Sequence, residues 1–346
     1  MTELGVKAEF LPRNGAKSTS SLAAVGLKRQ IGLPGMIAFI VGSIIGAGIF
    51  ASPRSVATYI GSTGGILLTW VVAGGVAITG ALIFCELALT FPDNCAGDYT
   101  YIYEAFGEFP AFVNLYLGLL DAPAGLALIS IVVGDYVMTA AVGEGDSSWS
   151  KVIGGTVIVL HMLINCYSVK LVERVQIFFT VTKMIPVAML VVTGLVRLGQ
   201  GHTGNFRHAF NGTSTSVSDF AFGLYGGLFA YGGWDIVNFL TAEAANPVRD
   251  IPVAISVAIP TVMVCYIMVN VCYLTVHTPQ EIGRSGAIAV NIANRLYGDF
   301  HWTVPALVAC SVFGASNAVS FKSARMFYEA ALRGMLGFSS FAVICR

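Results

Sequence analysis

Two glycine-rich stretches interrupt apolar runs of this chain. The first reads Gly-Ser-Ile-Ile-Gly-Ala-Gly-Ile-Phe over residues 42–50, and the second reads Gly-Gly-Leu-Phe-Ala-Tyr-Gly-Gly-Trp over residues 226–234. Glycine weakens a straight helix because it loses much backbone entropy on folding. Where a helix opens inside an apolar medium, its N–H and C=O groups must bind protein, water or a ligand.

The groups that such breaks expose suit a ligand with two opposite charges. N–H groups at the positive end of a half-helix favour a carboxylate, and freed carbonyl oxygens favour an ammonium. An α-amino acid carries both groups on one carbon atom. We therefore predict that the two stretches form one site for an amino acid substrate. The alternative is that the glycines serve only close helix packing.

A few ionisable residues lie in or beside the apolar runs. Lys183 lies about ten residues into its run, at a depth where an ammonium is costly, and is a candidate for function. Asp121 lies at a similar depth, so a buried pair with Lys183 is geometrically possible. Glu86 and Glu243 each close a run, where a gate that pairs with Lys or Arg and simple solvation are equal alternatives.

The composition requires a membrane around these residues. Hydrophobic residues make up 55% of the chain and charged residues only 11%, against roughly 25% charged in soluble domains. A spanning helix needs about 20 mainly apolar residues. We expect an all-α membrane protein with a tail over 1–30, a transmembrane domain over 31–327 and a second tail over 328–346. The eight expected spans lie near 32–57, 64–91, 110–141, 151–168, 174–198, 218–243, 253–276 and 303–327.

Other functional classes find little support in the sequence. The net charge of +0 gives no reason to expect a nucleic acid partner. The seven Cys show no CxxC spacing, and the five His are scattered without an HExxH motif. We therefore expect no metal site, no cofactor and no enzymatic activity.

The positions of Lys and Arg predict how the chain crosses the membrane. More of them fall on one side when the N-terminus is placed in the cytoplasm. This topology puts the sequon Asn211-Gly212-Thr213 outside, where Asn211 can be glycosylated. We expect a multi-pass protein of the plasma membrane with a cytoplasmic N-terminus.

Several motifs, in order, resemble those of the L-type amino acid transporter family, within the amino acid–polyamine–organocation superfamily. The resemblance covers about residues 28–330. The matching residues are Gly42 to Phe50, Gly97-Asp98-Tyr99, Asn165-Cys166-Tyr167-Ser168-Val169-Lys170, Phe229 to Trp234, Glu243 with Asn246-Pro247, and Ser323-Ala324-Arg325.

The resemblance implies a LeuT-like inverted-repeat fold whose first and sixth spans are interrupted, and transport by alternating access. It implies that the broken segments bind substrate through Gly46 and Ala230 and their neighbours. The amides of Ala47 and Gly48 would hold the carboxylate, and the carbonyls of Ile44, Phe229 and Gly232 the amine. Phe229 would also be the outer gate, and Lys183 would replace a sodium ion and brace the first span.

Departures from the family pattern bear on partners and substrate. The outer loop over 142–150 has no Cys, so we expect no covalent heavy-chain partner, while a non-covalent partner stays open. Gly232 stands where cation-accepting relatives can carry Asp, which favours neutral substrates. Asp235 stands where neutral-preferring members usually carry Asn, which favours exchange of cationic for neutral amino acids.

The family pattern continues with four more spans, so we expect the fold of the chain as written to be incomplete, with a divergent C-terminal tail. Exchange of neutral amino acids is the function we expect. A cationic/neutral exchanger and a non-transporting, truncated regulatory isoform are the alternatives.

Overall fold

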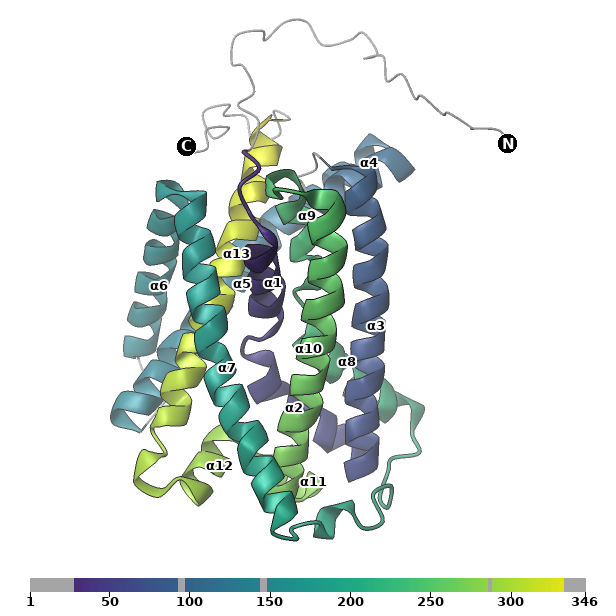
Figure 1. Cartoon of the computed structure of the whole chain (residues 1–346), viewed down its shortest axis with the longest axis vertical. Helices are drawn as coiled ribbons and strands as arrows, with labels where there is room; N and C mark the ends of the chain where they lie inside the picture. Colours follow the sequence, from purple (N-terminus) through teal and green to yellow (C-terminus); the bar gives the residue numbers. More distant parts are fainter. Residues whose placement is uncertain (1–27, 93–96, 144–147, 286–287, 333–346) are drawn as a thin grey trace, which may run out of the picture.

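The computed structural model describes residues 28–92, 97–143, 148–285 and 288–332, so most of the two expected tails lies outside the described residues. Within these ranges the chain is almost entirely helical and has no strand beyond one isolated bridge. The helices run roughly alongside one another in a tall bundle (Figure 1).

Six of the described helices are long and apolar enough to cross a membrane. Many of their apolar side chains, such as Leu128 and Leu163, are exposed on the surface, as expected for helices that face lipid. The protein is therefore a multi-pass membrane protein. The six helices are α3 (Thr63–Thr90), α5 (Glu108–Val142), α6 (Ser148–Tyr167), α7 (Val169–Gly199), α10 (Pro247–Val276) and α13 (Thr303–Leu332).

A bent pair of helices forms a seventh candidate span. Helix α1 (Leu33–Ile44) and helix α2 (Gly48–Ile60) meet at an angle of 41° across the glycine-rich residues 45–47. The pair occupies the centre of the bundle (Figure 1), where α1 packs against α7 and α10 and α2 packs against α8.

The expected span over 218–243 is not a single helix. Helix α8 (Val217–Tyr231) has 15 residues and ends at Gly232. After Gly233, whose φ of +110° suits glycine, the chain continues as short helical turns. These are η2 (Trp234–Ile236), α9 (Val237–Leu240) and η3 (Thr241–Glu243).

Short helices close the two ends of the bundle. At one end lies α4 (Asp98–Phe106), near α9 (Figure 1). At the other end lie η1 (Gly204–Phe206), α11 (Pro279–Arg284), α12 (Ile288–Leu296) and η4 (Gly298–Phe300). We call these the α4 end and the α11 end.

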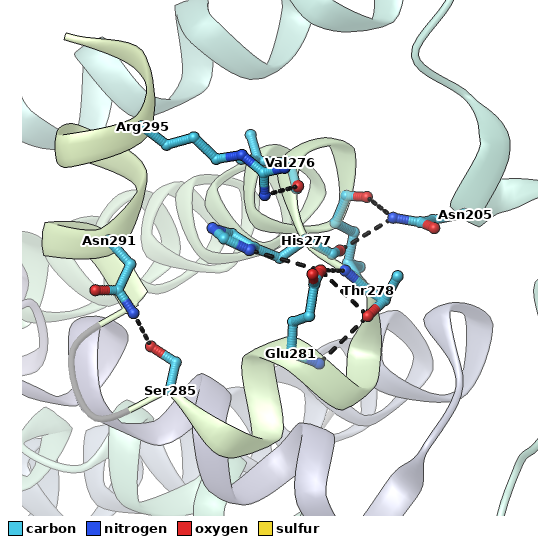
Figure 2. A network of polar contacts seen from close by, with 9 residues as sticks. Asn205, Val276, His277, Thr278, Glu281, Ser285, Asn291 and Arg295 are labelled. Atoms are coloured by element: carbon cyan, nitrogen blue, oxygen red, sulfur yellow. Dashed lines mark hydrogen bonds and ion pairs between the residues drawn. The ribbon is translucent and has the colours of Figure 1, made fainter. Parts of the chain in front are cut away.

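A polar network fixes the α11 end (Figure 2). The Asn205 amide donates to the carbonyls of Leu274 and His277, at 2.8 and 3.0 Å, where α10 ends. Thr278 and Glu281 form a capping box at the start of α11, which satisfies backbone N–H groups there. The last carbonyls of α10 are thus bound by side chains from neighbouring segments.

Candidate substrate site

The two helix breaks lie against each other. A Cβ atom added to Gly48 would lie 2.8 Å from Ala230 Cα, and one added to Gly233 would lie 2.7 Å from Ser43 Oγ. Both spacings are too short for a side chain at these positions. Glycine therefore lets the ends of α1, α2 and α8 approach each other.

The break between α1 and α2 presents backbone N–H groups. The first N–H groups of a helix have no partner within that helix, and α2 has no side-chain cap at Ala47. Gly46 is buried, whereas Ala47 and Gly48 are partly exposed. The start of α2 therefore has the geometry and the partial positive charge to hold a carboxylate.

Two of the three carbonyls expected to hold the amine, those of Ile44 and Phe229, already accept hydrogen bonds. The Tyr266 hydroxyl lies 2.9 Å from the carbonyl oxygen of Ile44 and 3.0 Å from that of Ala230. The Phe229 carbonyl accepts the Gly232 N–H at 3.1 Å. A carbonyl oxygen has two lone pairs, so each of these oxygens keeps one for an ammonium.

Tyr266 is a site residue that the sequence reasoning missed. It lies on α10, is fully buried, and packs against the rings of Trp70 on α3 and Tyr231 on α8, with centroids 5.5 and 4.9 Å apart. These rings fix the position of its hydroxyl. Its position in an apolar run gave no sign that the hydroxyl would face both breaks.

Lys183 lies beside the first break. Its ammonium is fully buried and donates to the carbonyls of Gly42 and Ile45, at 2.7 and 2.6 Å. The pair with Asp121 that the sequence left open is not formed, because Asp121 lies exposed on α5. The sequence could not show this, since it does not reveal the angles between the spans. The Lys183 ammonium therefore donates hydrogen bonds to backbone carbonyls near the end of α1.

Two further polar side chains of α7 continue this contact. Thr180 and Gln176 both donate to the Ala38 carbonyl of α1, at 2.9 and 3.3 Å. Asn317 of α13 donates to the Gln176 side chain at 2.8 Å. Gln176, Thr180 and Lys183 are spaced along one helix face, a signal that was available in the sequence. This polar stripe fixes α1 against α7.

The expected gate residues differ in their surroundings. Phe229 is 69% exposed, so its ring is not packed inside the protein. Glu86 is exposed and, within the described ranges, has no ion-pair partner. Glu243 is 1% exposed and forms an ion pair with Arg325 of α13. Its carbonyl also accepts the Ile31 N–H just before α1, at 2.9 Å.

Asp235 forms an ion pair with Lys322 of α13. It lies in η2, two residues after Gly233. Both side chains of the pair are about one third exposed. Lys322 lines a cavity of about 410 Å³ at the α4 end, together with Asp98 and Asp121. Asp98 accepts a hydrogen bond from Asn238 at 3.0 Å.

The predicted glycosylation site is exposed. Asn211 lies in the loop before α8, and the Thr213 hydroxyl of its sequon lies 2.6 Å from Ser62 Oγ at the start of α3. Among the residues that the structure describes, no group of three His, Cys, Asp or Glu could hold a metal ion.

Comparison with known proteins identifies relatives over most of the chain. The amino acid permease family matches residues 31–343. The mouse b(0,+)-type amino acid transporter 1 is 39% identical over 93% of this chain and 67% of its own length. The human cystine/glutamate transporter is 38% identical over 94% and 66%. The mouse large neutral amino acids transporter small subunit 2 is 35% identical over 93% and 61%.

The chain thus spans about two thirds of the length of these relatives. All of them are named as transporters, and none as an enzyme. Among solved structures, MhsT in complex with L-phenylalanine matches 92% of this chain and 77% of its own, with a TM-score of 0.68 and 13% identity. This likeness confirms the LeuT-like fold expected from the sequence.

Proposed function

Because the chain belongs to the amino acid permease family, we propose that it carries α-amino acids across a membrane by alternating access, exchanging one neutral substrate for another. The observation that carries the proposal is the contact between the two helix breaks. It puts the N–H groups at the start of α2 beside carbonyls at the end of α8.

A zwitterion fits this arrangement. Its carboxylate binds the N–H groups of Ala47 and Gly48, at the positive end of α2. Its ammonium binds the second lone pairs of the Ile44 and Phe229 carbonyls and the carbonyl of Gly232. Phe229 closes over the substrate from the outside by moving from its exposed position.

Lys183 has a supporting role in this proposal. Its ammonium supplies a fixed positive charge where the first span is unwound, as a bound cation would. Because α1 is also bound by Gln176 and Thr180, the half-helix moves together with α7 when the site changes its access. The ion pair of Glu243 with Arg325 closes the α4 end between openings.

Exchange is tested with the purified full chain in liposomes. Liposomes loaded with unlabelled L-leucine should take up external labelled L-leucine to a saturable level, whereas empty liposomes should take up little. Binding is tested separately, since a ligand that binds only the folded state raises the unfolding temperature. If millimolar L-leucine neither exchanges nor raises that temperature, the proposal is wrong.

We also propose a plasma membrane location with the N-terminus in the cytoplasm, which places the α11 end outside. Asn211 then receives a glycan in a eukaryotic cell. Asn211→Gln should remove an endoglycosidase-sensitive mobility shift on a gel. A wild-type chain that shows no such shift while it resides at the cell surface would contradict this placement.

A further inference from the structure

Asp235 is a carboxylate beside the proposed substrate site that has its own counter-ion. Gly232 and Gly233 form the break after α8, and Asp235 follows in the next helical turn, η2. A free carboxylate there would attract the positive side chain of a lysine or arginine substrate. In this protein the Lys322 ammonium forms an ion pair with that carboxylate.

Lys322 is held in this position from two directions. Besides its ion pair with Asp235, its ammonium lies 5.2 Å from the ring centroid of Phe239, within the range of a cation–π interaction. Phe239 belongs to α9, which continues the same broken span. Lys322 of α13 is therefore held against the segment that follows the second break.

The surroundings of Lys322 are acidic and accessible. Asp98 and Asp121 line the same cavity, which has room for a side chain as large as that of arginine. About one third of the Lys322 side chain is exposed. Without its ammonium, Asp98 and Asp121 would line this cavity with no resident cation, and Asp235 would lose its ion-pair partner.

We propose that Lys322 determines substrate specificity: its ammonium neutralises Asp235 and so excludes amino acids with cationic side chains. This inference rests on the proposed transport function and assigns the side-chain class. A pocket that contains a positive charge rejects a substrate with a positive side chain, and it accepts that substrate once the positive charge of the pocket is removed. A purely structural ion pair would instead affect all substrates equally when it is broken.

The test compares labelled L-arginine with labelled L-leucine in the full chain, as the ratio of kcat/KM in liposomes and of Kd in detergent. Lys322→Met keeps the length of the side chain and removes its charge. It should raise the arginine-to-leucine ratio by about tenfold or more, an effect of the size expected for one unscreened charge pair near a protein surface. Lys322→Arg keeps the charge and should keep the wild-type ratio.

Two further variants make the result specific. Lys322→Met combined with Asp235→Asn should lose the gain for arginine, because the carboxylate is gone. Lys170→Met changes an exposed lysine at the start of α7, away from this pair, and should leave the ratio unchanged. A gain that survives in the double variant would assign the attraction to other carboxylates and overturn the role of Asp235.

The failures of the two proposals are distinguishable. If the wild type binds and exchanges leucine but Lys322→Met shows no change in the ratio, only the specificity inference is overturned. Wild-type exchange of arginine as effective as that of leucine would overturn it without any variant. If the wild type neither binds nor exchanges leucine, the transport proposal fails and the inference fails with it.

Discussion

The Tyr266 hydroxyl lies 2.9 Å from the Ile44 carbonyl oxygen and also within hydrogen-bond distance of the Ala230 carbonyl oxygen. The first of these oxygens ends α1 and the second lies near the end of α8. One side chain of the unbroken helix α10 thus joins both broken spans. A movement of either half-helix must stretch one of these two contacts.

Replacement of Tyr266 by Phe removes the hydroxyl and keeps the ring. A hydrogen bond contributes about 1 kcal/mol net, so a site whose carbonyls lose this alignment should bind leucine about five- to tenfold more weakly. We expect a higher KM with a smaller change in kcat. Tyr273→Phe is the control, because the Tyr273 hydroxyl is buried and has no partner in the part of the chain described. Equal effects of both variants would contradict a role specific to Tyr266.

Lys183→Met removes the donor for the Gly42 and Ile45 carbonyls at nearly constant volume. Each buried acceptor left unpaired costs about 1–3 kcal/mol, although loss of the buried charge offsets part of this cost. We expect leucine uptake to fall at least about tenfold and thermal stability to fall less. Thr182→Val removes a hydroxyl whose bond, in the described part of the chain, is to the Phe178 carbonyl within α7, and it should leave uptake unchanged. Wild-type uptake by Lys183→Met would show that the ammonium is not needed.

The sequence predicted the breaks and their partnership better than the side chains around them. Glycine spacing identifies where a helix opens because the effect is local, and this holds for both 45–47 and 232–233. Tyr266, Lys322 and Arg325 act across helices, so their partners depend on how the spans cross. For the same reason the Asp121–Lys183 pair could only be left open from depth alone, and the structure does not form it.

Gly48→Ala should separate the two breaks. The added Cβ would lie 2.8 Å from Ala230 Cα, which is backbone and cannot rotate away. Overpacking of this kind costs typically about 1–3 kcal/mol, and we expect a lower unfolding temperature and loss of leucine binding. Gly75→Ala on α3 is the matched control, because a Cβ there meets nothing within 4 Å. It should be neutral or stabilising by up to about 1 kcal/mol. Intact leucine binding by Gly48→Ala would refute the contact.

The network at the α11 end should loosen in acid. The Thr278 N–H donates to Glu281 and lowers the pKa of this carboxyl below its ordinary value. Partial burial lowers the pKa of His277 below its ordinary value, and the nearby Arg295 charge adds to this, while Glu281 opposes it. Groups with a lowered pKa in the folded state bind fewer protons there than in the unfolded state.

Stability from both groups is therefore present at neutral pH. The stability that His277 contributes is lost as the pH falls below the ordinary histidine pKa of about 6.5. The stability that Glu281 contributes is lost as the pH falls through its lowered pKa. Amide hydrogen exchange in α11, corrected for the intrinsic rate, should speed up between pH 7 and pH 4. Glu281→Gln should remove the part of this dependence at the acid end. A pH-independent protection of α11 would contradict the assignment.

The Glu243–Arg325 ion pair at the α4 end should stabilise the start of α1. Both side chains are almost fully buried, and the second Glu243 carboxylate oxygen has no partner in the described part of the chain. Arg325→Met leaves a buried carboxylate without its counter-charge, a loss of about 3–5 kcal/mol in comparable cases. Because the Glu243 carbonyl also holds the Ile31 N–H, the start of α1 should loosen, and amide exchange at Ile31 should speed up. Arg325→Met with Glu243→Gln should recover much of the lost stability, since neither charge of this pair remains. If the double variant were as unstable as the single one, the loss would come from the packing of the Arg325 side chain on Phe321, and the ion pair would not be what closes this end.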